Sequence, residues 1–196
     1  MFSHISPLSA RKQEILNEAT SLFSQKGYVA ASMRDLAERL AIKPASLYSH
    51  YDSKEAILWE IALRCARDFH EAVLPLAGAP QRPTERLEAM LRAHLAAIIR
   101  NMDAASIFFR EWKQLGEPLR TEYAALIARY EETFAGVIQE GIDQGLLRSL
   151  HPKFATSVLL SSVNWIHQWY RPTGSMSLEE IGDQLVLQLL SGMQER

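Results

Sequence analysis

The stretch SMRDLAERLAIKPASLYSHY at residues 32–51 decides the fold, because it predicts two very short helices joined by a tight turn. Ser32 followed by Asp35 is a capping-box pattern that starts a helix over 32–40, and Pro44 suits the first turn of a helix over 44–50. A helix of about seven residues is unstable alone and persists only when it docks on neighbouring helices. The stretch therefore predicts a helix-turn-helix.

Apolar residues around this stretch recur at intervals of three and four, as on the buried face of a helix. The first short helix carries Met33, Leu36, Ala37 and Leu40, and the second has Ile42, Ala45 and Leu47 facing inward. The preceding helix, over 9–26, supplies a floor made of Ile15, Leu16, Ala19, Leu22 and Phe23. Together these residues predict a compact three-helix core.

The rest of the chain also reads as helix, with no alternating strand pattern. Further helices are expected over 54–77, 83–101, 103–115, 119–144, 152–170 and 177–193. Pro83, Pro152 and the Ser177/Glu180 capping box mark helix starts. We predict an all-α protein of about nine helices, with a helix-turn-helix domain over 1–53 and a larger helical domain over 54–196.

Composition sets limits on function. The chain has 196 residues, a net charge of −2 and one cysteine, Cys65, which favours a reducing cytoplasm. No apolar run is long enough to cross a membrane, and the first ten residues do not resemble a signal peptide. Residues 1–55 hold seven Lys/Arg and six Asp/Glu, so a DNA-binding head there depends on a few placed groups.

Four motifs at fixed spacing resemble the DNA-binding domain of the TetR family of transcriptional repressors. They are Gly27-Tyr28, the run at 32–37, the run SLYSHY at 46–51 and the run SKEAIL at 53–58. Ala41 stands where the family commonly has glycine in the turn, and Lys43 where it commonly has Ser or Thr. The resemblance implies a homodimer that binds double-stranded DNA at a palindromic operator.

The second short helix is then expected to lie in the major groove, with its flanks on phosphates. Ser46 and Ser49 are suited to hydrogen bonds with the DNA, and Pro44 and Ala45 to thymine methyls. The resemblance implies that Tyr48 and Lys54, together with His50, bind the phosphate backbone of the DNA. The candidate DNA-binding residues are Ser32, Arg34, Lys43, Pro44, Ala45, Ser46, Tyr48, Ser49, His50 and Lys54.

Bulky apolar stripes fill the larger domain, and such stripes either form a core or line an apolar pocket. His94, in a largely apolar helix, is open to both interpretations: a hydrogen-bonded core histidine or a ligand contact. The candidate ligand-binding residues are Phe69, Met90, His94, Phe108, Phe109, Trp112, Tyr130, Trp165 and Trp169.

A second resemblance concerns the motifs FREW at 109–112, Asn164-Trp165 and WYRP at 169–172. These are similar to the TetR regulators that control the breakdown of fatty acids, steroids or aromatic acids. That similarity implies an acyl coenzyme A thioester as effector, with Arg110, Arg129 or Arg171 available for its phosphates. No cofactor or metal is expected.

The last two predicted helices carry apolar surface on more than one side, which a two-fold partner would cover. The candidate dimer-interface residues are Phe154, Val158, Ser161, Trp165, Ile181, Leu185 and Leu189.

Two other classes of function compete with this one. An enzyme is disfavoured, because His70-Glu71 lacks the second histidine of a zincin and no phosphate loop or nucleophile elbow is present. A helical ligand-binding or interaction protein of the same fold, which senses a hydrophobic compound other than a coenzyme A thioester, is the alternative. In the repressor, ligand bound among helices 54–144 is expected to displace helix 54–77 and change the spacing of the two DNA-binding heads.

Overall fold

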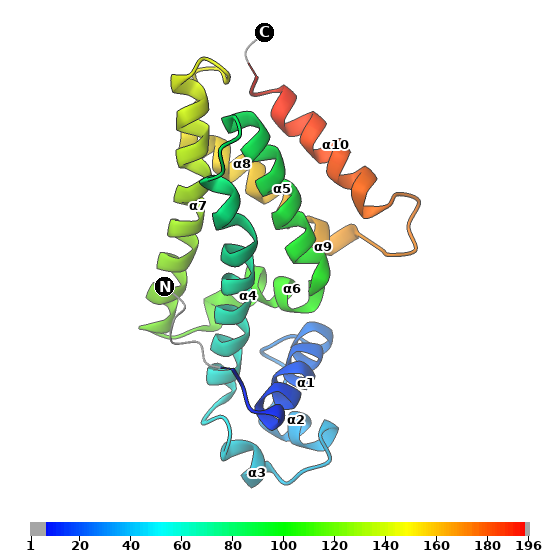
Figure 1. Ribbon diagram of the computed structural model, residues 1–196. Coiled ribbons are helices and arrows are strands. Elements are labelled where there is room, and N and C mark those ends of the chain that lie inside the picture. The colour runs from blue at the N-terminus through cyan, green and yellow to red at the C-terminus, as the bar shows by residue number, and fades with distance from the viewer. Residues whose placement is uncertain (1–6, 195–196) are drawn as a thin grey trace. The chain divides into compact units, whose positions relative to one another are not determined.

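A computed structural model describes residues 7–194, and within this range all the regular elements are helices (Figure 1). They are α1 Ala10–Lys26, α2 Met33–Arg39, α3 Pro44–Tyr48, α4 Lys54–Ala77, α5 Pro83–Arg100, α6 Met102–Arg110, the short 3₁₀-helix η1 Glu111–Gln114, α7 Leu119–Asp143, α8 Pro152–Asn164, α9 Ile166–Trp169 and α10 Leu178–Ser191. The predicted all-α class with an N-terminal helix-turn-helix is confirmed.

Two of the expected helices are interrupted. The segment 103–115 divides into α6 and η1, and the segment 152–170 divides into α8 and the four-residue α9 at Trp165. At the second break, the ring of His167 donates from Nδ1 to the carbonyl oxygen of Asn164 at 2.5 Å. A side chain thus caps a carbonyl group at the end of α8.

The helix starts follow the local sequence. Ser32 and Asp35 form a reciprocal capping box at α2, and Ser177 and Glu180 form a second one at α10. Pro44, Pro83 and Pro152 occupy the first turns of α3, α5 and α8, where a missing N–H costs nothing. These boundaries confirm the predicted capping signals.

The chain divides into two compact units. The first unit contains the residues up to Arg67 together with Met102–Ala124, and the second contains Asp68–Asn101 together with the residues from Ala125 onwards. Both α4 and α7 therefore begin in the first unit and end in the second.

In the first unit, α1 packs against both α2 and α6, and α2 packs against α3. The predicted face of α1 is buried, as are Met33, Leu36, Ala37 and Leu47. Ser24 Oγ donates to Asp103 Oδ1 at 2.7 Å, which ties α1 to α6. Ala45, expected on the inner face, is instead exposed, because a helix of only five residues has a single turn to bury.

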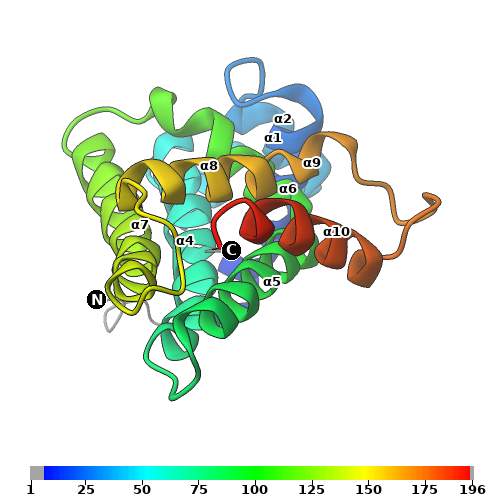
Figure 2. The ribbon, with the colours of Figure 1, turned by 90° about the horizontal axis from the view of Figure 1, so that it is seen from above.

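In the second unit, α5 lies against both α8 and α10 (Figure 2). Its core includes Leu87, Met90, Ile98 and Phe134, each of them fully buried. In the described part of the chain, no helix combines the length and the apolar character that crossing a membrane requires.

Candidate nucleic-acid interface and effector site

The turn between α2 and α3 keeps a left-handed residue although it has no glycine. Ala41 has φ 53°, a conformation that a side chain makes unfavourable by about 1–2 kcal/mol. The N–H groups of Ala41 and Ile42 donate to the carbonyl oxygens of Glu38 and Ala37 at 3.1 and 3.0 Å. The departure from the usual glycine has therefore left the turn geometry intact.

Helix α3 exposes almost its whole surface to solvent. Leu47 is its only buried residue, whereas Pro44, Ala45, Ser46 and Tyr48 are exposed. Beyond its end, Ser49 is exposed and donates from Oγ to the Ser46 carbonyl oxygen at 2.7 Å, so its hydroxyl oxygen is left as an acceptor. His50 is half-buried. A short helix anchored by one leucine, with its other side chains outward, has the form that enters a DNA groove.

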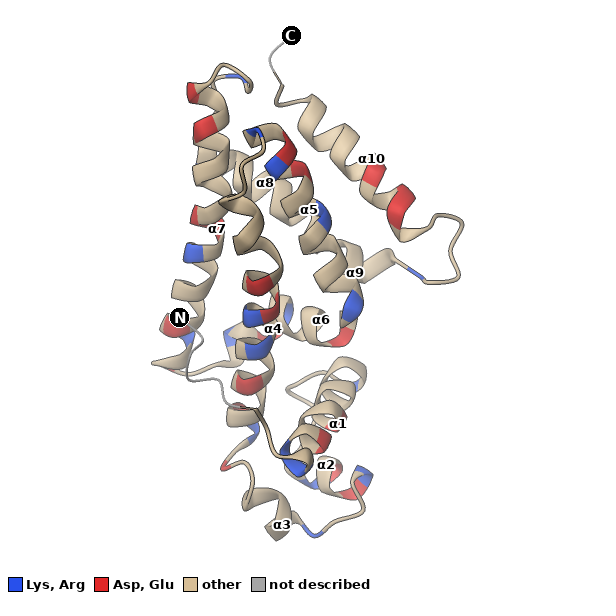
Figure 3. Cartoon of the chain, in the orientation of Figure 1, with Lys and Arg blue, Asp and Glu red and all other residues tan. Residues whose placement is uncertain are grey.

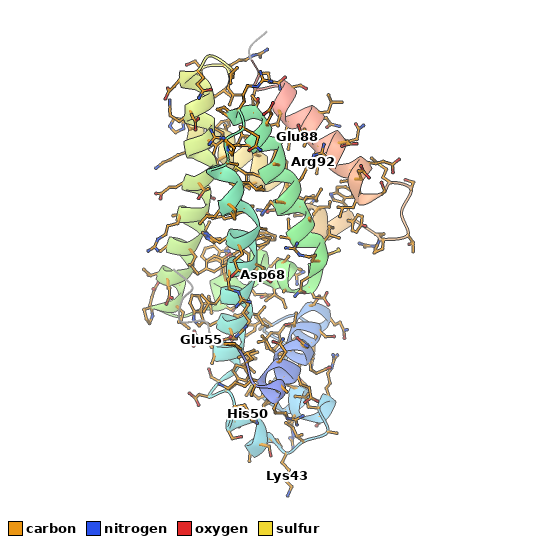
Figure 4. All side chains as sticks on the ribbon, viewed as in Figure 1. Lys43, His50, Glu55, Asp68, Glu88 and Arg92 are labelled. Carbon is orange, nitrogen blue, oxygen red and sulfur yellow. The ribbon has the colours of Figure 1, made fainter. Side chains whose placement is uncertain are left out.

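Lys and Arg residues occur on α1, on α2 and in the loop before α3 (Figure 3), and some of them are held in ion pairs whereas others are not. Lys26 pairs with Asp35 at 2.7 Å, and Arg39 pairs with Glu18 at 3.1 Å. The side chains of Arg34 and Lys43 are exposed and make no ion pair or hydrogen bond with any residue of 7–194. Figure 4 shows the Lys43 side chain extending away from the ribbon. These two charges are the ones free to meet phosphates.

Lys54 has a different environment from the other candidate phosphate contacts. Its ammonium group donates to the carbonyl oxygens of Tyr28 at 2.7 Å and Ala31 at 2.8 Å, and it lies over the Tyr28 ring at 4.2 Å. Burial lowers the pKa of Lys54. The lysine thus holds the loop between α1 and α2, a role the sequence reading missed.

Ser32 also uses its hydroxyl inside the protein. Its Oγ accepts from the Asp35 N–H at 3.1 Å and donates to the Asp35 carboxylate at 2.9 Å. Hydrogen bonds from Lys26 and Ser32 lower the pKa of Asp35 to about 2. Ser32 therefore stabilises the start of α2.

Several candidate ligand-binding residues meet in the second unit. The His94 ring lies 4.9 Å from the Phe69 ring and 5.5 Å from the Tyr130 ring, centroid to centroid, and Phe134 closes the cluster. Met90, one turn earlier on α5, is fully buried. These side chains come from α4, α5 and α7.

A hydrogen-bonded chain runs through this cluster. Tyr130 Oη lies 2.8 Å from His94 Nδ1, and His94 Nε2 lies 2.7 Å from Asn164 Oδ1. Burial lowers the pKa of His94 to about 4, so the ring is neutral at pH 7. His94 is thus a buried, doubly hydrogen-bonded histidine. Asn164 was named from the sequence only as part of the Asn164-Trp165 motif and not as a candidate site residue. A polar residue at the end of an apolar helix was the signal that could have identified it.

The other ligand-binding candidates lie elsewhere. Phe108, Phe109 and Trp112 belong to the first unit, where Trp112 stacks on Tyr123 with ring centroids 5.6 Å apart and Tyr123 Oη donates to the Phe108 carbonyl oxygen. Trp165 and Trp169 are 63% and 49% exposed. The nine candidates therefore do not form one cluster within either unit.

The candidate dimer face is largely open on α8. Phe154 is 70% exposed, and Val158, Ser161 and Trp165 are exposed as well. On α10, Leu185 and Leu189 are half-buried, whereas Ile181 is buried within its own unit. Leu187, an apolar residue of α10 that is not among the seven candidates, is 60% exposed. Within the described range, no group of three or more His, Cys, Asp or Glu side chains is placed to hold a metal ion.

Comparison with known proteins gives two family matches. Residues 15–61 match the family of bacterial regulatory proteins of the TetR type, and residues 80–193 match the tetracyclin repressor-like C-terminal domain. Both descriptions are of regulatory proteins rather than enzymes.

Three individual proteins illustrate the similarity. The HTH-type transcriptional repressor KstR2 of Rhodococcus jostii strain RHA1 is 29% identical over 94% of this chain and 92% of its own length. The TetR family regulator PfmR from Thermus thermophilus is 33% identical, with a TM-score of 0.84 over 92% of this chain and 99% of PfmR. AibR, solved in complex with isovaleryl coenzyme A and operator DNA, is 28% identical, with a TM-score of 0.84 over 91% of this chain and 97% of AibR.

Proposed function

Because this chain belongs to the TetR family of bacterial transcriptional regulators, we propose that it represses its target genes as a homodimer on a palindromic operator and is released by an acyl coenzyme A thioester. It acts in the cytoplasm, where its operator and its effector are found together. The domain at the N-terminus reads the DNA, and residues 54–196 bind the effector and the second subunit.

The surface of α3 carries the DNA-binding part of this proposal. Leu47 anchors the helix, and the outward Pro44, Ala45, Ser46 and Ser49 meet base edges in the major groove. Arg34 and Lys43 meet phosphates on the flanks, with Tyr48 and His50 beside them. Lys54 contributes mainly through the loop that it holds, because its ammonium group already donates to two carbonyl oxygens.

The dimer is supported by exposed apolar side chains that a monomer would leave in water. Phe154, Val158 and Trp165 lie on α8 and at its end, and Leu187 lies on α10. Large aromatic side chains of this kind are typical of the buried centre of an interface. Two subunits joined through α8 and α10 place two copies of α3 on the half-sites of a palindrome.

The effector class is supported by one relative. AibR, which is 28% identical to this chain, was solved with isovaleryl coenzyme A. Helix α4 offers the mechanical link, since it is continuous from Lys54, at the DNA-binding end, to Phe69 in the aromatic cluster. An effector that displaces α4 changes the spacing of the two heads and lowers their affinity for the operator.

Fluorescence anisotropy with a labelled duplex from upstream of the protein's own gene tests this function. The ligand-free protein is expected to bind the duplex, to lose affinity when one half-site is scrambled, and to be released by an acyl coenzyme A. Binding that ignores the palindrome would refute the repressor assignment. Release only by hydrophobic compounds that lack coenzyme A would favour the alternative effector class.

The dimer is tested with Trp165→Glu, which places a charge on the exposed face without disturbing a core. Sedimentation should show a shift from dimer to monomer and a large loss of operator affinity. Gln168→Glu, an exposed position on α9, is the matched control and should leave the dimer intact. A Trp165→Glu protein that stays dimeric would show that this face is not the interface.

A further inference from the structure

Asn164 is held in one orientation by its neighbours in the second unit. A neutral imidazole carries one N–H, and an amide oxygen can only accept, so the His94 proton lies on Nε2 and is donated to Asn164 Oδ1 at 2.7 Å. His94 Nδ1 then accepts from Tyr130 Oη at 2.8 Å. With its oxygen turned to His94, Asn164 directs its amide nitrogen elsewhere.

That amide nitrogen has two N–H donors that the protein does not use. Within residues 7–194, neither N–H of Asn164 makes a hydrogen bond. Asn164 is half-buried, and its side chain sits at the last residue of α8, beside the cluster formed by Phe69, Tyr130 and Phe134. The nitrogen is not among the buried atoms that lack a partner, so its two N–H groups are open to an incoming ligand.

A second unused polar group lies on the same stripe of α8. Thr156, Leu160 and Asn164 follow one another at intervals of four residues and therefore share one helix face. Thr156 is 1% exposed, and its Oγ1 has no hydrogen-bond partner among the described residues. Thr156 and Leu160 are buried, so Asn164, which is half-buried, is the residue of this stripe that a ligand can reach.

We propose that the Asn164 amide nitrogen donates a hydrogen bond to the carbonyl oxygen of the effector's acyl thioester, and that His94 and Tyr130 are positioning residues that hold Asn164 in this orientation. This inference rests on the proposed function and adds the group that recognises the effector's carbonyl.

The chemistry of the three residues selects a neutral carbonyl over a free carboxylate. Tyr130, His94 and Asn164 are all uncharged at pH 7, and burial keeps His94 so. A carboxylate placed against them would lose its hydration without gaining a counter-charge, which makes its burial unfavourable. A thioester carbonyl oxygen is uncharged, so a hydrogen bond from a neutral donor satisfies it. The Asn164 amide N–H is such a donor.

The test compares ligands that differ only at the carbonyl. The full-length dimer is titrated with butyryl, octanoyl and palmitoyl coenzyme A, and with the S-alkyl coenzyme A thioethers of the same chain lengths. For the best chain length, the thioester should bind about tenfold more tightly than the thioether, as expected for one hydrogen bond. Both ligand series should release operator DNA at saturation.

Three variants locate the effect. Asn164→Asp keeps the acceptor for His94 but lacks the donor, and should abolish the thioester preference, while its added charge lowers the affinity for thioester and thioether alike. Tyr130→Phe should reduce the preference, because it frees the ring of His94. Tyr123→Phe removes a buried hydroxyl that donates to the Phe108 carbonyl oxygen instead, and should keep the tenfold ratio.

The outcomes separate this inference from the proposed function. Equal binding of thioester and thioether by the wild-type protein, with both releasing DNA, would overturn the role of Asn164 and leave the repressor assignment standing. A tenfold preference that survives in Asn164→Asp would assign the carbonyl to another residue. If no coenzyme A compound binds, both the effector class and this inference are wrong.

Discussion

The two units place their candidate functional residues in opposite ways. In the first unit, the groups suited to DNA stand on the outside of α3, and only Leu47 points inward. In the second unit, Tyr130 and His94 are buried, and Asn164 is half-buried. DNA is too large to be enclosed and is contacted by exposed side chains, whereas a small apolar ligand is bound tightly only where the protein surrounds it. Substitutions on the exposed side of α3 should therefore affect recognition without affecting stability, whereas substitutions in the buried cluster of the second unit should affect both.

The largest effect is expected at the anchor of α3. Leu47→Ala removes a fully buried side chain and should lower the free energy of unfolding by about 2–5 kcal/mol. Operator binding should be lost with it. Tyr48→Phe, on the exposed side of the same helix, should change stability by less than about 0.5 kcal/mol. Urea denaturation measures both, and similar losses in the two variants would contradict the single-anchor description.

A smaller loss is expected from removing the central histidine of the second unit. His94→Leu leaves Tyr130 Oη and Asn164 Oδ1 without partners in a buried cluster and should cost about 2 kcal/mol of unfolding free energy. Operator affinity without effector should be unchanged at a temperature where the variant is folded. An equally stable variant would mean that packing alone holds the cluster.

The same histidine predicts a pH dependence. Its pKa is lowered by burial to about 4, so the unfolded chain binds a proton more readily than the folded protein between about pH 6.5 and 4. Stability is fully present above this window and is lost as pH falls through it, by up to about 1.4 kcal/mol per pH unit. Burial also lowers the pKa of His70, which acts with the same sign. Denaturation of His94→Leu across this range should show a shallower slope, and an identical slope would exclude His94 as a cause.

The smallest effect contrasts two lysines of the first unit. Lys54→Met removes the donor to the carbonyl oxygens of Tyr28 and Ala31 and should cost about 1 kcal/mol of stability. Lys43→Met should leave stability unchanged. It should reduce the slope of the logarithm of the operator-binding constant against the logarithm of salt concentration by about 1, as expected for the loss of one phosphate contact. Anisotropy titrations at several salt concentrations separate the two. A reduced salt slope for Lys54→Met at unchanged stability would make Lys54 a direct phosphate contact.

The fold was largely predictable because its signals are local. The capping boxes at Ser32 and Ser177 and the prolines at helix starts act through neighbouring backbone groups, so a short window of sequence contains the whole interaction. The break at Trp165 was not predictable in this way. At this break the ring of His167 donates a hydrogen bond to the carbonyl oxygen of Asn164. The periodic spacing of apolar residues, from which the helix was predicted, carries no information about this bond.

The amino-acid sequence by itself determined that this is an all-helical TetR-type regulator, and it predicts which short helix faces the DNA. Those features depend on periodicity, caps and motif spacing within a few turns. Only the tertiary structure decided that Lys54 holds a loop, that Ile181 is buried within its own unit, and that His94 joins Tyr130 to Asn164. Each of these depends on residues at least 23 positions apart or on the packing of separate helices, and no local pattern specifies such contacts.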